Sequence, residues 1–247
     1  MSFNALILAG SRGGLDPVAA YAGVPHKALI TVGGQTMLAR VVDALRAAGA
    51  GRILVSTNDE TVRRETLALG TEPIAAEAGP SASAARGFAL GGAPLLLTTA
   101  DHALLRPEWI TTFVDAVPED ADVAILLARR ETIERDVPAT RRTYLRFADG
   151  DWSGCNLFWL ATPAANAALD LWQHVEQDRK RPWRIVRRLG IMPLIRYATG
   201  RLTLASALAD IGARIGVRPR VVESPFGLAA VDVDKPGDLD LVRGLVE

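Results

Sequence analysis

The sequence predicts an α/β protein built on one mostly parallel sheet flanked by helices. Short apolar runs alternate, over the first half of the chain, with segments whose apolar residues recur at helical spacing. Glycine-containing or polar loops separate the two kinds of segment. Strands joined through helices form right-handed βαβ units, whose ligands bind at the carboxyl ends of the strands. We therefore expect the functional residues in loops that follow strands.

The individual elements follow from these patterns in order. The first strand, 5–9, is an apolar run that ends in Gly10, and the first long helix runs from Met37 towards Gly49. A Gly/Ser loop at 79–83 is expected to open a helix over 84–90. The pattern also predicts strands at 53–56, 73–74, 95–99, 122–128 and 231–233, and helices at 60–69, 107–116, 164–177 and from Asp238.

These elements are expected to form a single domain over residues 1–247. Residues 1–128 would form a nucleotide-binding half. Residues 129–230, where the alternation breaks, would cap the sheet and receive a second substrate. Residues 231–247 would supply the last strand, with metal ligands, and the terminal helix.

Composition limits the class of protein. An apolar fraction of 49% with 23% charged residues is typical of a globular chain. Lys+Arg and Asp+Glu are equal at 28 each, so the molecule has no overall field to attract nucleic acid. Its single cysteine, Cys155, excludes an intramolecular disulfide and is interpreted as structural. The sequence begins without a signal-peptide pattern, and we expect a cytoplasmic protein.

The loop after the first strand has the character of a phosphate-binding loop. Small residues there let backbone N–H groups approach phosphate oxygens. Arg12 adds a cation with bidentate geometry, and Lys27 adds a second point charge. The predicted nucleotide-binding residues in this region are Leu8, Ala9, Gly10, Ser11, Arg12, Gly13 and Lys27.

This part of the sequence resembles the nucleotidyltransferase superfamily that includes MobA-like and sugar-phosphate nucleotidyltransferases. The resemblance rests on Leu8-Ala9-Gly10 at a strand end, then Arg12, then Pro25 and Lys27. It implies a Rossmann-like sheet of the nucleotide-diphospho-sugar transferase type, with a helical and basic insertion in the C-terminal half. It also implies catalytic roles for Arg12, Lys27 and Asp101.

Three aspartates are candidate Mg²⁺ ligands. Nucleotidyl transfer needs a divalent ion on the triphosphate, and Mg²⁺ takes only one or two protein carboxylates. Asp101 ends the apolar strand 95–99, and Asp232 and Asp234 alternate with valines in the run 231–233. Both segments resemble the acidic motifs of the family. The prediction is Mg²⁺ held by Asp101, Asp232 and, as a substitute, Asp234.

The remaining candidate residues concern the base and the acceptor. Ser81 and Ser83 resemble the family segment that meets the base, although either serine is equally well interpreted as a helix N-cap. The segment from Arg141 to Asn156 resembles the loop and strand that bind the second substrate in this family. The predicted acceptor-binding residues are His102, Arg142, Tyr144, Arg146 and Asn156. Arg142, Tyr144 and Arg146 have an alternative interpretation as the wet face of a strand.

The predicted function is transfer of a nucleotidyl group from an NTP to a phosphorylated small alcohol or sugar, with release of pyrophosphate. The long first loop and the ending Asp232–Pro236 resemble enzymes that use CTP. Three alternatives stay open: a molybdenum-cofactor guanylyltransferase-like enzyme, a nucleotide-sugar glycosyltransferase and a catalytically silent nucleotide-binding protein. A glycosyltransferase usually has D-x-D at the central strand end, where this chain has Asp101-His102-Ala103.

Residues 179–201 form a basic segment with interleaved apolar residues. It is interpreted either as two surface helices, separated at Pro193, whose apolar residues pack on the domain, or as a surface that contacts an anionic acceptor or membrane headgroups. Its cations are Arg179, Lys180, Arg181, Arg184, Arg187, Arg188, Arg196 and Arg201.

Overall fold

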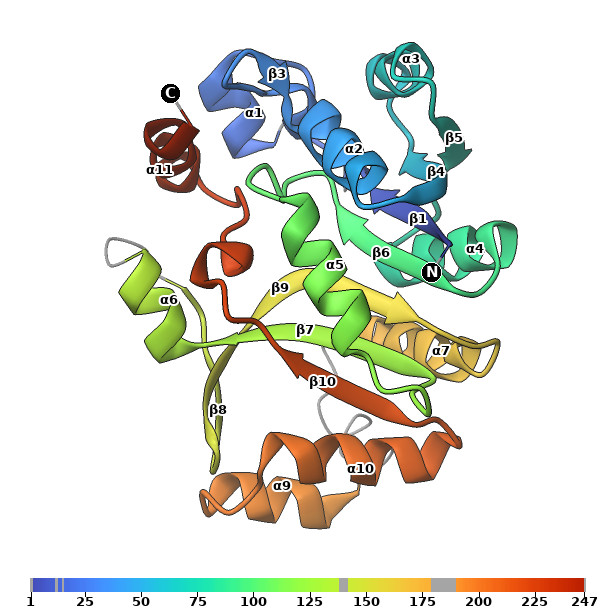
Figure 1. The fold of residues 1–247 in the computed structure, drawn as a ribbon, viewed down its shortest axis with the longest axis vertical. Coiled ribbons are helices and arrows are strands. Elements are labelled where there is room, and N and C mark those ends of the chain that lie inside the picture. Colours follow the sequence, from blue (N-terminus) through green and yellow to red (C-terminus); the bar gives the residue numbers. More distant parts are fainter. Residues whose placement is uncertain (1, 12, 15, 138–141, 179–189, 247) are drawn as a thin grey trace.

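A computed structural model describes residues 2–11, 13–14, 16–137, 142–178 and 190–246. Its centre is an eight-stranded sheet in the order β10-β7-β9-β6-β1-β4-β5, with β8 paired to β9 (Figure 1). The strands of this sheet are β1 (Phe3–Leu8), β4 (Ala50–Thr57), β5 (Glu72–Ala75), β6 (Leu95–Thr99), β7 (Val123–Arg129), β8 (Leu145–Phe147), β9 (Gly150–Leu160) and β10 (Pro219–Glu223).

Most pairings in the sheet are parallel, as predicted. Strand β1 pairs in parallel with β4 and β6, β4 with β5, and β10 with β7. Strand β9 is the exception, because it lies antiparallel between β6 and β7. It joins the two parallel groups into one sheet, so the chain has the fold class predicted from its sequence.

Helices cover both faces of the sheet (Figure 1). Phe3, Ala5 and Ile7 of β1 pack in the same core as the helices α2 and α5, whereas Leu6 points to the opposite face and packs with α4 and α7. The helices are α1 (Pro17–Ala22), α2 (Met37–Ala47), α3 (Glu60–Ala68), α4 (Pro80–Gly91), α5 (Pro107–Ala116), α6 (Arg130–Asp136), α7 (Ala165–Gln177), α9 (Ile191–Ala198), α10 (Leu204–Ile215) and α11 (Pro236–Val246), with the short 3₁₀ turns η1 (Lys27–Leu29) and η2 (Gly227–Ala230) and a small hairpin of β2 (Thr31–Val32) and β3 (Gln35–Thr36).

Two predicted elements differ from the structure. Helix α4 begins at Pro80, so residues 80–83 belong to the helix and not to a loop. Proline at the first helical position loses no hydrogen bond there, and its fixed φ favours the helix. The run 231–233 was predicted as a strand, but in the structure it is irregular chain that follows η2. It still buries Val231 and Val233, and Val233 N donates to Asp101 O over 3.1 Å.

The basic segment is described only from residue 190 onward, and 179–189 lie outside the described residues. Helix α9 contains Pro193 in its first turn, so the predicted break at this proline is wrong there. Arg196 donates to Ser206 Oγ over 3.0 Å and to Asp210 over 3.4 Å in α10, which lies beside α9 in Figure 1. None of the described helices has the length and apolar content needed to span a bilayer.

Candidate functional site

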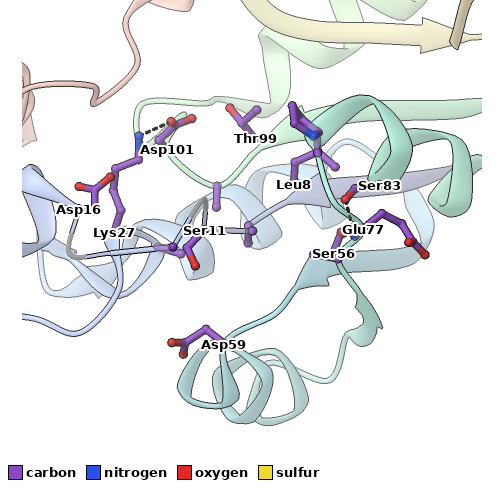
Figure 2. A pocket seen from close by; sticks show the side chains of 18 of the residues that line it. Leu8, Ser11, Asp16, Lys27, Ser56, Asp59, Glu77, Ser83, Thr99 and Asp101 are labelled. Atoms are coloured by element: carbon purple, nitrogen blue, oxygen red, sulfur yellow. Dashed lines mark hydrogen bonds and ion pairs between the residues drawn. The ribbon is translucent and has the colours of Figure 1, made fainter. Parts of the chain in front are cut away.

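A cavity of about 1090 Å³ opens at the carboxyl ends of β1, β4 and β6. The first loop, the turn that carries Lys27, the start of α4 and the end of α7 surround it. Figure 2 shows the side chains that face it. The predicted nucleotide-binding residues that line it are Leu8, Ala9, Gly10, Ser11, Gly13, Lys27, Ser81 and Ser83, whereas Arg12 lies outside the described residues.

Backbone hydrogen bonds extend the sheet into the first loop. Ala9 N donates to Ser56 O over 2.8 Å, and Leu8 O accepts from Ala100 N over 3.0 Å. Beyond the strand, Asn58 accepts from Ser11 N over 3.0 Å and donates to Ser11 O over 3.1 Å. These contacts fix the loop against the neighbouring strand ends. Sequence reasoning missed Asn58, whose only signal was its position just after a predicted strand.

Lys27 is positioned by the buried residue before it. His26 Nδ1 accepts from Ala28 N over 3.1 Å and so caps the turn η1. Burial lowers the pKa of His26, against the nearby Asp59 and Asp16 carboxylates, which act in the opposite direction. The ring is therefore neutral near pH 7, which leaves Nδ1 free to accept a hydrogen bond. Sequence reasoning also missed this role.

Lys27 joins two of the predicted metal ligands. Its Nζ lies 2.6 Å from Asp101 Oδ2 and 3.3 Å from Asp234 Oδ1, and Figure 2 shows the first of these ion pairs. Burial alone would lower the pKa of Lys27, but the Asp101 and Asp234 carboxylates together outweigh burial, and the pKa is raised. Burial, followed by the charge of Asp232, raises the pKa of Asp234. The three acids thus lie near enough to interact.

Asp232 is held from the other side. Arg142 Nη2 donates to Asp232 Oδ1, and Asn156 Nδ2 donates to Asp232 Oδ2 over 2.7 Å. Asn156 has a φ of 49° at a point where the pairing of β9 with β7 shifts register. A positive φ in a residue other than glycine is uncommon and tends to occur at functional sites. Here it accompanies an amide that is aimed at a carboxylate.

His102 lies next to both acidic groups and is fully buried. Burial lowers the pKa of His102 to about 4, although Asp232 and Asp101 each act to raise it. The imidazole is therefore neutral at pH 7, with one N–H donor. Its ring packs against that of Trp109, with centroids 6.1 Å apart. His102 is thus packed within the Asp101 loop, and its contact with the acceptor stays a prediction.

The other two predicted acceptor residues, Tyr144 and Arg146, have contacts with other side chains and strands. The guanidinium of Arg130 lies 5.4 Å from the centre of the Tyr144 ring. Arg146 is exposed on β8 and pairs across the strands with Asp151. The structure therefore brings Arg142 and Asn156 together at Asp232, whereas Tyr144 lies beside Arg130 and Arg146 lies opposite Asp151.

Ser81 and Ser83 occupy the first turn and a half of α4 and are both buried. Neither is the N-cap, because Gly79 holds that position without a side-chain hydrogen bond. Ser83 Oγ accepts from Glu77 N over 2.9 Å. Ser81 N donates to Glu176 Oε2 over 3.1 Å, and Ser81 Oγ donates to the same oxygen. Nothing in the sequence indicated that a residue of α7 would reach this point.

The residues at the cavity floor fit a divalent ion and a phosphate ligand. Among the described residues, Asp101 Oδ1, Ser56 Oγ and Thr99 Oγ1 are buried polar atoms without a hydrogen-bond partner. Native proteins rarely leave such atoms unpaired, so these three are suited to a bound ligand. A hard oxygen ligand such as Asp101 Oδ1 is what Mg²⁺ prefers. Groups of three or more His, Cys, Asp or Glu in a cage-like cluster do not occur in the described part of the chain.

The fold and this site define a class. The overall fold is similar to those of solved structures whose descriptions name transferases. A hypothetical transferase from Thermus thermophilus is 28% identical with a TM-score of 0.81, covering 97% of this chain and all of that one. The 2-C-methyl-D-erythritol 4-phosphate cytidylyltransferase of the same organism is 15% identical with a TM-score of 0.56, covering 99% of this chain and 98% of that one.

A third solved structure is a CMP:2-keto-3-deoxy-manno-octonic acid synthetase complexed with CTP, 17% identical with a TM-score of 0.58 over 99% of this chain and 97% of that one. No curated protein sequence matches this chain significantly. Residues 5–192 match the model of the MobA-like NTP transferase domain. The chain belongs to this family of NTP transferase domains, as its first-loop motif indicated.

Proposed function

We propose that this protein transfers CMP from CTP to a phosphorylated small alcohol or sugar and releases pyrophosphate. The observation that carries the proposal is Lys27 Nζ bound between Asp101 and Asp234 at the floor of the cavity. Charge stabilisation and positioning dominate phosphoryl-type transfer, and a cation beside two carboxylates provides groups for both the phosphates and a divalent ion. Cytosine is favoured by the length of the first loop and by the two cytidine-linked enzymes of the same fold.

In this proposal the acceptor phosphate attacks the α-phosphorus of CTP, in line with the departing pyrophosphate. The acceptor phosphate is already ionised, so no residue has to remove a proton from it. Mg²⁺, when bound, neutralises charge on the triphosphate. Asp101 and Asp232 would hold the ion, with Asp234 as a substitute, and Arg12 and Lys27 would bear the remaining phosphate charge.

The acceptor would bind on the Asp232 side of the Asp101 loop. Arg142 is the best candidate for its phosphate, because it is a guanidinium already placed beside Asp232. Asn156 would position it together with Asp232. His102, Tyr144 and Arg146 stay predictions as acceptor contacts. We also propose that residues 1–247 form a single domain, that the protein is cytoplasmic, and that it does not bind nucleic acid.

The decisive experiment is to incubate the protein with Mg²⁺, each of the four NTPs and a pool of phosphorylated metabolites, and to measure pyrophosphate. Acceptor-dependent release is expected, with CTP favoured when the NTPs compete at equal concentration. A clear preference for GTP would instead support a molybdenum-cofactor guanylyltransferase-like enzyme. Absence of pyrophosphate release with every pair would leave the silent nucleotide-binding protein and the glycosyltransferase. A separate incubation with nucleotide-sugars distinguishes these two, because only the glycosyltransferase would consume one.

We also propose peripheral contact of the α9 surface with anionic membranes. Met192 is 61% exposed, and Leu194, Ile195 and Tyr197 are each 47% exposed, so the apolar face of α9 is open to solvent. In the sequence, arginines accompany these apolar residues throughout 179–201, a pattern that is typical of interfacial segments. Flotation with anionic vesicles at low ionic strength tests the contact. Binding should decrease as the salt concentration rises. If the protein floats no more with vesicles than without them, the proposed membrane contact is refuted.

A further inference from the structure

Glu176 is a charged side chain in the cavity wall that the proposed chemistry does not use. It lies near the end of α7 and reaches across to the first turn of α4. Helices α4 and α7 pack on the same face of the sheet, where Ala84 and Phe88 share a core with Leu169. The contact between the two helices is therefore a fixed part of the fold, which holds Glu176 at the cavity.

The carboxylate is seated closely at the helix end. Its Oε2 accepts from Ser81 N over 3.1 Å and from Ser81 Oγ. A Cβ atom at Gly79 would lie only 2.6 Å from Glu176 Oε1, so the glycine leaves the space that this oxygen occupies. Gly79 provides no side-chain cap, and a carboxylate from another helix takes over that task. Both hydrogen bonds from Ser81 engage Oε2. Oε1 lies against Gly79 and keeps its acceptor capacity, and Glu176 lines the cavity.

A carboxylate in this place distinguishes between bases. It has only acceptors, so it needs a donor on the base edge. Cytosine presents its N4 amino group, for which Glu and Asp are the matching side chains. Uracil has a carbonyl oxygen at the same position, and two acceptors repel each other. The discrimination would come from Glu176, and not from the backbone of α4, since backbone N–H groups are donors.

We propose that Glu176 is a specificity-determining residue that accepts a hydrogen bond from the exocyclic amino group of cytosine and so excludes UTP. This inference rests on the proposed use of CTP by the same cavity. Gln173 and Gln177, which line the cavity from the same helix, are uncharged neighbours that do not enforce this choice.

The test compares CTP with UTP in the wild type and in Glu176→Gln. The glutamine keeps an amide oxygen for Ser81, so α4 stays capped, but it also brings an NH₂ group that can donate to the uracil carbonyl. The ratio of kcat/KM for CTP over that for UTP should fall about tenfold or more, in the range of one base-edge hydrogen bond. Glu77→Gln is the matched control, since Glu77 also lines the cavity but its carboxylate lies 3.6 Å from Arg86. Its ratio should equal that of the wild type.

An unchanged ratio in Glu176→Gln, with an unchanged Tm, would overturn the inference and leave Glu176 as a helix cap only. A second arm needs no variant: the wild type is given N4,N4-dimethyl-CTP, which has no N4 donor. We expect it to be used at least about tenfold less well than CTP, and equal use overturns the inference.

Calorimetric binding of CTP and UTP without acceptor separates this inference from the proposed function. Tighter binding of CTP, lost in Glu176→Gln, supports the role of Glu176 even if no acceptor yields pyrophosphate. Transfer with pyrophosphate release but with GTP preferred over CTP overturns the inference while leaving nucleotidyl transfer intact.

Discussion

The ion pair between Lys27 Nζ and Asp101 Oδ2, 2.6 Å long, joins two groups that suit opposite charges. Lysine is suited to a phosphate and aspartate to a cation, and each neutralises the other while no substrate is bound. The Asp101 side chain has a relative exposure of 16%, so water screens this pair only in part. When a nucleotide binds with its metal ion, Lys27 would pair with a phosphate and Asp101 with the metal ion, in place of the ion pair between them.

Asp101→Asn removes the charge but keeps the shape. We expect kcat to fall about 100-fold or more, in the range found when one charge-stabilising group is lost. Pyrophosphate release under saturating CTP measures it. The control is Asp115→Asn, because Asp115 is exposed on α5 and does not line the cavity. Near-full activity of Asp101→Asn would refute the assignment of Asp101 as a metal ligand.

Asp101 and Lys27 were predictable from the sequence, whereas several residues that position the loops of the site or line the cavity were not. Asp101 and Lys27 follow recognisable strand and loop patterns, so the sequence alone indicated their neighbourhood. Asn58 and Glu176 contact Ser11 and Ser81, which are far from them in the sequence, so these contacts depend on how elements pack. His26 caps the turn that follows it, a local role that its residue type did not indicate. Polar residues of these types are common on any surface, so no local pattern separates the few that reach the cavity.

At the scale of elements, the acidic segment 231–234 depends on the turn before it. A strand was predicted there because Val231 and Val233 alternate with aspartates. The structure keeps the alternation of buried and outward residues, but this run pairs with none of the described strands, and Val233 N donates to Asp101 O in a loop. Periodicity reports which side chains are buried, and it does not report backbone pairing.

The turn η2 sets the position of Asp232 through its contact with α6. Gly227 N donates to Asp136 Oδ2 over 2.7 Å, and a Cβ atom at Gly227 would lie 2.4 Å from Thr132 O and 2.8 Å from Ile133 Cα. These are backbone atoms, which cannot turn aside as a side-chain end can. Glycine is therefore required by close approach.

Gly227→Ala should lower the free energy of unfolding by about 1–3 kcal/mol through overpacking, and should also reduce kcat because Asp232 shifts with η2. Urea unfolding and pyrophosphate release measure the two effects. Gly244→Ala in α11 is the control, since a Cβ atom at Gly244 would have nothing within 4 Å, and alanine favours a helix over glycine. It should be neutral or slightly stabilising, and equal losses in both variants would contradict the packing argument.

At the scale of the whole molecule, the single antiparallel strand β9 unites two parallel groups of strands. The ends of these groups meet at Asp122. Its backbone O accepts from Ala161 N over 2.9 Å, and its carboxylate accepts from Thr162 Oγ1 over 2.8 Å and from Arg218 N over 2.9 Å. The Arg218 guanidinium donates two more hydrogen bonds of 3.0 Å. One buried carboxylate thus ties β7 to the chain that leaves β9 and the chain that enters β10.

Acid should loosen this junction. The Arg218 guanidinium holds the pKa of Asp122 well below its usual value of 3.8, with Thr162 and the Arg218 backbone acting in the same direction against burial. Because the pKa in the folded state is depressed, Asp122 contributes its full stability above about pH 4 and loses it as the pH falls below that value.

The exposed guanidinium is partly screened, so we expect Asp122→Asn to lower the free energy of unfolding by about 1–2 kcal/mol at pH 7. The gap between wild type and variant should narrow at pH 3, as followed by thermal unfolding at pH 7, 5 and 3, with Asp115→Asn showing no gap at any pH. A gap that stays constant from pH 7 to pH 3 would mean that the charge of Asp122 does not stabilise the junction.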